Sequence, residues 1–160
     1  MLAESNKLIL DTFQSLIDSI KIYDDSVHFW IQGGALRRTL DKSLVFGEKT
    51  NNFQDPIDID IYFKDEKSFN KVLEIFKKHL GFRLVDEIGD NLYFEDGSVR
   101  IDLIKPYSHL FANRFTKLVF SDAENSPYWA DFCISSASLD SEYNLYYHKD
   151  FFKDISEKKL

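Results

Sequence analysis

The segment from Ile57 to Phe63 constrains the fold of this chain most, because apolar and polar side chains alternate along it. Alternation with a period of two is typical of a strand with one face against a core. Asp58 and Asp60 therefore share one face of the predicted strand, about 7 Å apart. Two carboxylates this close repel each other unless water, a cation or a shifted pKa relieves them. Taken alone, a solvated strand face explains the pattern equally well.

A second alternating segment, residues 99–103, carries one acid, Asp102, among apolar neighbours. If this strand lies beside the first, Asp102 faces the same side as Asp58 and Asp60. Carboxylates on adjacent strands suit Mg²⁺ (or Mn²⁺), because Mg²⁺ prefers oxygen ligands and usually keeps waters and substrate phosphates. Two such ions stabilise the attacking and leaving oxygens of an in-line displacement. The three acids therefore predict a two-metal site.

A glycine pair, Gly33 and Gly34, separates a predicted strand over residues 27–32 from a predicted helix over residues 35–40. Glycine lets the backbone approach an anion closely, and a helix start offers free N–H groups and a favourable dipole. Arg37 lies one turn inside and is long enough to reach a phosphate. A glycine pair alone is more often just a turn. Its place one strand before the two acids predicts a phosphate-binding segment.

Helical spacing of apolar residues predicts two longer helices, over residues 5–23 and 65–80. Asp65 is the expected N-cap of the second helix, and Gly81 lies where its C-terminus needs a glycine. Asp-Gly and Gly-Asp pairs separate three further alternating segments, which we interpret as a three-stranded meander. Its predicted strands cover residues 82–88, 91–95 and 98–104.

Beyond Pro106 the pattern weakens, and it predicts only a strand over residues 117–120 and a helix over residues 131–139. No repeat or linker divides the chain. We therefore expect one domain, residues 1–160, of the α+β class, with a mixed central sheet and flanking helices.

Composition narrows the partners and the compartment. The formal net charge of −7 is unlike the basic surface that a nucleic-acid binder usually shows. The single cysteine, Cys133, cannot form an internal disulfide, and this fits a reducing, cytoplasmic location. No stretch approaches the roughly 20 apolar residues of a membrane span, so we expect no membrane partner.

The order of these features resembles the polymerase β-like nucleotidyltransferase superfamily, and most closely the head domain of bacterial-type tRNA nucleotidyltransferases and poly(A) polymerases. Residues 33–37 resemble that family's Gly-Gly-Ala-Val-Arg segment, and residues 58–61 resemble its Asp-Ile-Asp-Ile strand. Residues 131–140 resemble its Asp-Phe-Thr-Ile-Asn-Ala-Leu-Ala-Tyr-Asp segment, and Asn144 with Leu145 fits the Asn-Leu that follows.

The resemblance implies the polymerase β-like fold and a role for each matching residue. Asp58 and Asp60 would bind the catalytic metals, and Asp102 matches a third acid that helps to deprotonate the attacking hydroxyl. The resemblance also implies a nucleotide-binding set: Gly33, Gly34, Arg37, Arg38 and Asp131. Within that set, Arg38 replaces the family's usual Asp and adds a positive charge near the phosphates. We also expect Lys105 to reach this site.

Other departures concern the substrate. Trp129 and Ala130 stand where the family has two arginines, and Cys133 and Ser135 replace its Thr and Asn. Those family positions grip the incoming nucleotide. The chain also ends near the point where the family's neck, body and tail domains begin. We therefore do not expect it to rebuild tRNA ends alone.

The resulting hypothesis is a metal-dependent enzyme that transfers a nucleoside monophosphate from a nucleoside triphosphate to an acceptor hydroxyl and releases pyrophosphate. The acceptor is a protein, a small molecule or an RNA 3′ end held by a partner subunit. The alternative is a catalytically inactive module of the same fold that binds a nucleotide or a protein partner. The four histidines lack metal-ligand spacing, and we expect the aromatic residues between 143 and 152 to serve mainly in packing.

Overall fold

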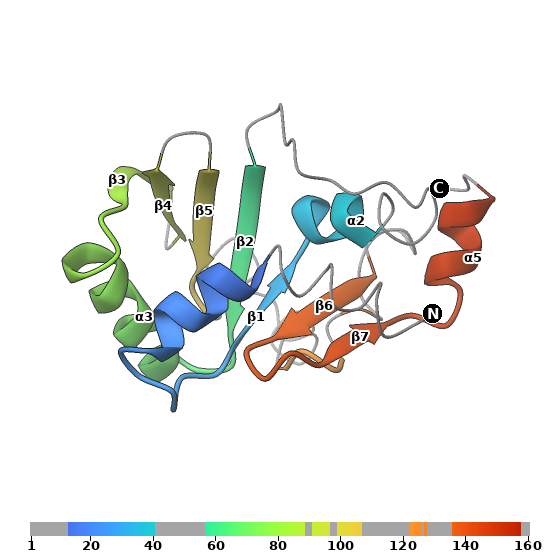
Figure 1. The fold of residues 1–160 in the computed structure, drawn as a ribbon, viewed down its shortest axis with the longest axis horizontal. Coiled ribbons are helices and arrows are strands. Elements are labelled where there is room, and N and C mark those ends of the chain that lie inside the picture. Colours follow the sequence, from blue (N-terminus) through green and yellow to red (C-terminus); the bar gives the residue numbers. More distant parts are fainter. Residues whose placement is uncertain are drawn as a thin grey trace.

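The computed structural model describes residues 13–40, 57–88, 91–96, 99–106, 122–125, 127 and 136–157. The first helix covers residues 13–21 of the described part. The later elements are β1 (Phe29–Gln32), α2 (Gly34–Leu40), β2 (Ile57–Phe63), α3 (Glu66–Lys78), β3 (Arg83–Ile88), β4 (Asn91–Asp96), β5 (Val99–Ile104), β6 (Ala137–Asp140), β7 (Leu145–Tyr147) and α5 (Phe151–Ser156). Along the chain, β1, α2, β2 and α3 alternate, and they are followed by successive strands and a final helix (Figure 1).

The described strands form one seven-stranded sheet in the order β3-β4-β5-β2-β1-β6-β7. The central pair, β2 and β5, is parallel, and every other neighbouring pair is antiparallel. The sheet is therefore mixed, as the sequence predicts. The parallel pair needs a long crossover, which α3 and the β3–β4 hairpin provide.

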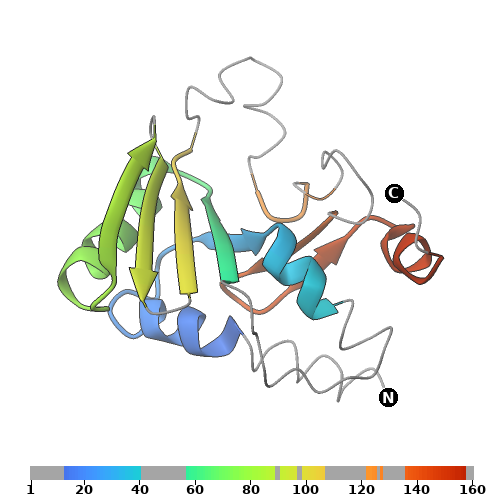
Figure 2. The same cartoon turned by 90° about the horizontal axis from the view of Figure 1, so that it is seen from above.

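One face of the sheet is apolar and is covered by helices. Alternate residues of the strands enter a continuous core together with residues of the helix over 13–21, α2 and α3. Seen from above, the helix over 13–21 and α2 lie along the same side of the sheet (Figure 2). The strand residues of this core are Phe29, Ile31, Ile59, Ile61, Phe63, Phe94, Ile101, Leu103, Ala137 and Leu139.

The opposite face of the sheet is polar. Residues directly opposite each other on paired strands share a face, so the register lines up a band of polar and aromatic side chains across β4, β5, β2, β1, β6 and β7. This polar face comprises Tyr93, Glu95, Arg100, Asp102, Asp58, Asp60, Tyr62, Trp30, Gln32, Ser138, Asp140 and Tyr146. The alternation of β2 therefore separates the core from the candidate site.

The predicted N-cap of α3 is confirmed, whereas the C-cap is His79, two residues before Gly81. The Asp65 carboxylate accepts a hydrogen bond from the Ser68 backbone N–H at 2.7 Å, which satisfies one free donor of the first turn. Lys77 and Lys78 lie in the last turn, where positive charge opposes the helix dipole. Gly81 follows with a φ of 70°, a left-handed conformation that glycine adopts readily.

The predicted helix over residues 131–139 is wrong in its C-terminal part. Ala137–Asp140 form β6, which pairs with both β1 and β7. Short apolar-polar runs are ambiguous in sequence, and here pairing with a distant strand decides the conformation. Residues 131–135 of that prediction, and the predicted strand over 117–120, lie outside the described residues.

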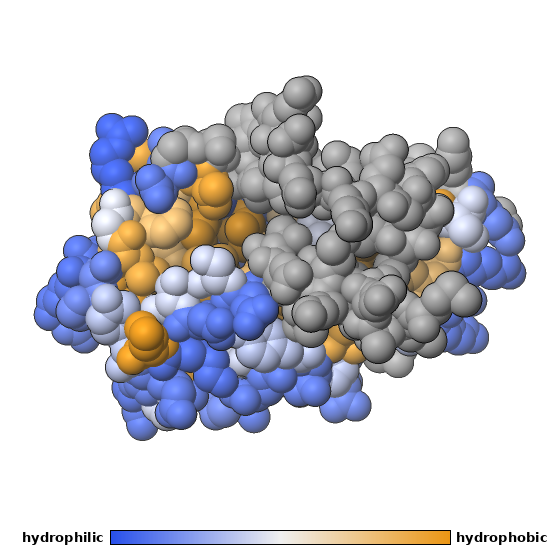
Figure 3. All heavy atoms as spheres, viewed as in Figure 1, coloured by the Kyte–Doolittle hydropathy of each residue, from blue (hydrophilic) through white to orange (hydrophobic). Residues whose placement is uncertain are grey.

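The outer surface of the helices is hydrophilic where α3 and the helix over 13–21 face solvent (Figure 3). Among the described residues, the exposed large apolar side chains lie directly after the first helix (Ile22 and Tyr23) or on the two edge strands (Leu84, Val85, Ile88 and Tyr147). Within the described ranges, none of the helices is long and apolar enough to cross a membrane.

Candidate active site

Two carboxylates of the predicted site are direct neighbours on the central parallel strands. Asp60 of β2 is in register with Asp102 of β5, and on its other side Asp60 is opposite Gln32 of β1. Asp58 lies two residues earlier on the same face and is exposed. The structure therefore brings Asp60 and Asp102 together, as the sequence predicts, and places Asp58 at the more open end of the row.

The electrostatics of this pair favour a cation. Burial and the nearby charges of Asp102 and Asp58 raise the pKa of Asp60 from 3.8 to about 7. Burial and the charge of Asp58 also raise the pKa of Asp102, against the lowering effect of Arg100. Each acid thus resists ionisation beside the others. A bound divalent cation would remove that penalty.

Arg100 is a site residue that the sequence interpretation missed. Its Nε donates to Asp102 Oδ1 at 3.1 Å, and its guanidinium carbon lies 4.4 Å from the centroid of the Tyr93 ring. The register also sets Arg100 opposite Asp58. The available signal was its position two residues before Asp102 in an alternating strand, which places both side chains on one face.

Gly33 links the glycine segment to the carboxylates. Its φ is 109°, and a Cβ at this position would lie 2.5 Å from Asp60 Oδ2. Both the backbone conformation and the close approach of the carboxylate therefore require glycine. Gly34 begins α2, and a Cβ added there would meet no atom within 4 Å. The predicted juxtaposition of the glycine pair and the acids is present.

The other predicted residues have different outcomes. Arg37 lies in the first turn of α2 and is half-buried. Asp131 and the side chain of Arg38 lie outside the described part of the chain. The expectation for Lys105 is wrong: its Nζ lies 3.4 Å from Glu66 Oε1 at the start of α3. Lys105 lies an odd number of residues from Asp102, and this alternation directs it away from the polar face.

The carboxylates of the site can supply only some of the ligands that a Mg²⁺ ion needs. Among the described residues, no three His, Cys, Asp or Glu side chains gather closely enough to hold one ion. Mg²⁺ commonly needs only one or two carboxylates, with waters and substrate phosphates completing the shell. The adjacent acids Asp60 and Asp102 supply such a pair. The chemistry of the donors therefore fits a metal that is shared with a phosphorylated substrate.

An aromatic stack borders the acids on the polar face. The rings of Trp30 and Tyr62 are stacked at a centroid distance of 6.0 Å with an interplanar angle of 14°. Burial and the charges of Asp60 and Asp102 raise the pKa of the Tyr62 phenol. The phenol therefore stays protonated and uncharged beside the carboxylates.

Similar proteins are found among solved structures. No family model matches the sequence, and no curated protein is significantly similar to it. A CCA-adding enzyme in complex with CTP is 18% identical with a TM-score of 0.62, over 94% of this chain and 34% of that one. The Thermotoga maritima CCA-adding enzyme in complex with tRNA is 18% identical with a TM-score of 0.60, over 94% of this chain and 33% of that one. The chain has a nucleotidyltransferase fold.

A third structure extends this likeness. A tRNA nucleotidyltransferase in complex with a primer tRNA and an incoming ATP analogue is 16% identical with a TM-score of 0.57, over 88% of this chain and 37% of that one. The nucleotidyltransferase fold thus accounts for nearly the whole chain. The chain spans only about a third of the length of these enzymes. The fold expected from the sequence resemblance is confirmed.

Proposed function

We propose that this chain is a metal-dependent nucleotidyltransferase. The observation that carries the proposal is the in-register pair Asp60 and Asp102 on adjacent parallel strands, with Gly33 against the Asp60 carboxylate. Two half-buried acids with raised pKa values beside a glycine turn at a helix start form a cation site next to a phosphate site. The nucleotidyltransferase fold of the chain supports the same conclusion.

Each residue has a defined task in this proposal. Asp58, Asp60 and Asp102 hold the divalent cations, which when bound neutralise charge on the triphosphate and favour attack at its α-phosphorus. The glycine segment and its helix hold the triphosphate. The residues assigned to that second task are Gly33, Gly34, Arg37, Arg38 and Asp131.

The chemical step is a displacement at phosphorus. The acceptor hydroxyl oxygen forms a bond to the α-phosphorus, and its proton passes to Asp102. The bond from the α-phosphorus to the oxygen that bridges to the β-phosphate breaks, and pyrophosphate leaves with the electron pair. Attacking and leaving oxygens lie roughly in line in such transfers.

Arg100 acts as a positioning residue for Asp102. The 3.1 Å contact between its Nε and Asp102 Oδ1 orients that carboxylate, and its charge offsets the mutual repulsion of the acids. The face of Tyr93 supports the guanidinium group. This arrangement keeps the second oxygen of Asp102 available for a cation or for the acceptor proton.

Titration of each of the four nucleoside triphosphates, with and without Mg²⁺, tests the proposal. We expect one or more to bind only with Mg²⁺, and binding to be lost in Asp58→Asn/Asp60→Asn. The matched control is Glu87→Gln, an exposed acid on the edge strand β3, which should bind like wild type. Equal binding by wild type and the double variant would overturn the metal site. Binding with no transfer to any acceptor would favour the inactive module instead.

A further inference from the structure

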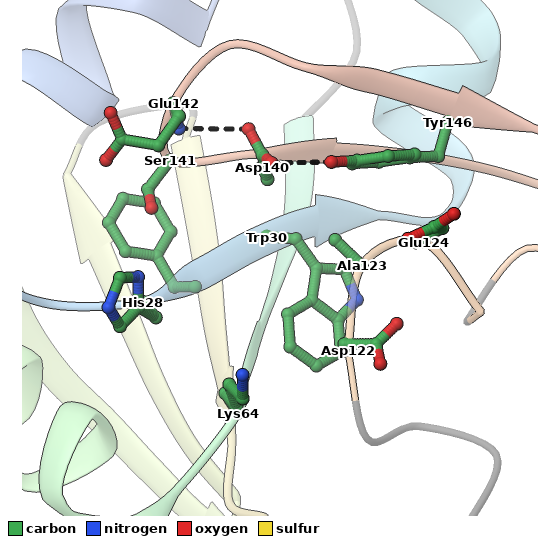
Figure 4. A pocket seen from close by; sticks show the side chains of 11 residues that line it. His28, Trp30, Lys64, Asp122, Ala123, Glu124, Asp140, Ser141, Glu142 and Tyr146 are labelled. Atoms are coloured by element: carbon green, nitrogen blue, oxygen red, sulfur yellow. Dashed lines mark hydrogen bonds between the residues drawn. The ribbon is translucent and has the colours of Figure 1, made fainter.

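A second feature of the polar face is a cavity of about 310 Å³. It lies where β1 begins and β2 ends, and the turn over residues 122–125 borders it (Figure 4). Its volume is at the lower end of small-molecule sites, which span roughly 300–1,000 Å³. The lining residues are His28, Phe29, Trp30, Lys64, Asp122, Ala123, Glu124, Asp140, Ser141, Glu142 and Tyr146.

The cavity and the glycine segment lie on opposite sides of the acid pair. Gly33 follows the C-terminal end of β1, whereas the cavity adjoins His28 and Trp30 at its N-terminal end. Trp30 is opposite Tyr62, two residues or about 7 Å along β2 from Asp60. In an in-line displacement the acceptor hydroxyl approaches the α-phosphorus from the side opposite the leaving pyrophosphate. If the β- and γ-phosphates lie at Gly33, the acceptor therefore lies on the side of the acid pair away from Gly33. The cavity is on that side.

The cavity is negatively charged. Four acidic residues line it, Asp122, Glu124, Asp140 and Glu142, against the ammonium group of Lys64 and the imidazole of His28. The Glu142 carboxylate is neutralised by an ion pair with Lys21 at 2.6 Å, so the unneutralised charge comes from Asp122, Glu124 and Asp140. Burial, the contact with Asp140 and the charges of Glu124 and Asp122 raise the pKa of the Tyr146 phenol, which reflects the negative potential here.

Two of these carboxylates are held in place by local hydrogen bonds. Asp140 accepts from the Glu142 backbone N–H at 2.9 Å and from the Tyr146 hydroxyl at 3.2 Å, both drawn in Figure 4. Asp122 accepts from the backbone N–H of Asn125 at 2.9 Å. These donors fix the position of both carboxylate groups. The negative charge is therefore a built feature of the cavity wall.

Trp30, at the wall of this cavity, carries an unpartnered polar group. Its side chain is 2% exposed, and its Nε1 has no hydrogen-bond partner within the described part of the protein. In Figure 4 the indole lies between β1 and the turn that carries Asp122, Ala123 and Glu124. A buried N–H group without an acceptor costs free energy. A ligand oxygen that displaces the atoms now covering the indole N–H would satisfy it.

We propose that this cavity is the acceptor subsite and that it binds a small molecule carrying a protonated amine and a hydroxyl group. The amine forms charge-assisted hydrogen bonds to the Asp122 and Glu124 carboxylates. The indole N–H of Trp30 donates to a ligand oxygen, and the reacting hydroxyl extends to the Asp60–Asp102 pair. The proposal rests on the proposed function and names its acceptor class. Phosphodiesters of an RNA end would meet repulsion at the same wall.

Binding of amines to the full chain tests the subsite without any transfer reaction. The probes are glucosamine and ethanolamine, each with its N-acetylated counterpart, followed by ligand-observed NMR. We expect both amines to bind at least tenfold more tightly than the neutral amides. Asp122→Asn/Glu124→Gln should remove that preference, and Glu87→Gln should keep it. Equal binding of amines and amides, or no binding of either amine at millimolar concentration, would overturn the proposal.

Two double variants separate this proposal from the proposed function. Asp58→Asn/Asp60→Asn should keep amine binding although it loses Mg²⁺-dependent nucleotide binding. Asp122→Asn/Glu124→Gln should show the reverse. Trp30→Phe keeps a six-membered ring against Tyr62 and removes the N–H group together with the rest of the five-membered ring, so it should weaken ethanolamine binding more than it weakens binding of 1,4-diaminobutane, which has no hydroxyl. Loss of both nucleotide and amine binding in either double variant would mean that the cavity is not a separate subsite.

Discussion

At the scale of single residues, the site is made by the backbone register and not by long, adjustable side chains. Asp60 and Asp102 are neighbours because β2 and β5 pair in parallel at those positions, and Gly33 is beside them because β1 ends there. Short side chains on central strands have little freedom to move apart. Their repulsion is therefore a permanent property of the metal-free protein.

Asp60→Asn should stabilise the metal-free protein at neutral and alkaline pH. The pKa of Asp60 is about 7 in the folded chain against an ordinary value of 3.8. The folded state thus holds this proton more tightly, and wild-type stability falls as pH rises from about 4 to about 7. The variant removes this loss, so we expect a gain of about 2 kcal/mol at pH 8 and none at pH 4. Urea unfolding at both pH values measures it.

Mg²⁺ provides the control for this prediction. It should raise the unfolding temperature of wild type at pH 8, because it binds only the folded acid pair. Asp60→Asn should lose most of that rise. A variant that is equally stable at pH 4 and pH 8, or that keeps the full response to Mg²⁺, would contradict the account of the pair.

Gly33→Ala should destabilise the chain by about 1–3 kcal/mol, because the new Cβ would have a φ of 109° and would displace the Asp60 carboxylate. Gly34→Ala is the matched control, since its Cβ would meet nothing within 4 Å. We expect Mg²⁺-dependent nucleotide binding to be lost at position 33 and kept at position 34. Thermal unfolding and nucleotide titration measure both effects. Similar behaviour of the two variants would refute the assigned role of Gly33.

Arg100→Gln should bind Mg²⁺ several-fold more tightly than wild type, because it removes a positive charge beside Asp102 and opposite Asp58. Arg100→Lys, which keeps the charge, should stay near wild type in affinity. Calorimetric titration of Mg²⁺ alone distinguishes the variants. Weaker Mg²⁺ binding by Arg100→Gln would show that orientation of Asp102 outweighs the charge.

At the scale of elements, the sequence predicted correctly those strands whose conformation is set by neighbouring residues in the chain. The alternation over Ile57–Phe63 and the Gly-Asp and Asp-Gly turns predicted β2, β3, β4 and β5 with bounds close to those observed. β6 was predicted as helix because its conformation depends on pairing with β1, more than a hundred residues earlier. Arg100 was missed although its contact with Asp102 lies within β5. Its positions opposite Asp58 and over the Tyr93 ring follow from the pairing of β5 with β2 and β4.

Asp65→Ala tests whether α3 is independent of the site. The variant loses the hydrogen bond from the Ser68 N–H, and loss of such a cap costs about 1 kcal/mol. Asp65→Asn should retain most of the cap. Because α3 covers the apolar face, nucleotide and Mg²⁺ affinities should not change in either variant. Unfolding curves and titrations together check this, and a fall in affinity would link α3 to the polar face.

At the scale of the whole molecule, charge limits the partners. The chain carries a formal net charge of −7, and acids dominate both the metal site and the adjoining cavity. Affinity for nucleic acid depends largely on neutralising phosphates with basic side chains. The large enzymes of similar fold are complexed with tRNA, but this chain spans about a third of their length.

We expect the isolated chain to bind tRNA weakly. The logarithm of the affinity should fall only shallowly with the logarithm of the salt concentration, because few phosphates are neutralised. Filter binding over a range of salt concentrations, with a basic RNA-binding protein as control, measures this slope. Tight binding with a steep slope would show that a local group of basic side chains outweighs the acidic total charge.

The parallel pairing of β2 with β5 also has a kinetic consequence. Residues 57–62 must meet residues 99–104 across an intervening helix and hairpin, and non-local pairings of this kind form late in folding. Asp60 and Asp102 are not held beside each other until β2 and β5 have paired. Partly folded chains without this pairing therefore lack the Asp60–Asp102 pair, and the Mg²⁺ response during refolding would report closure of the central sheet rather than formation of its separate elements.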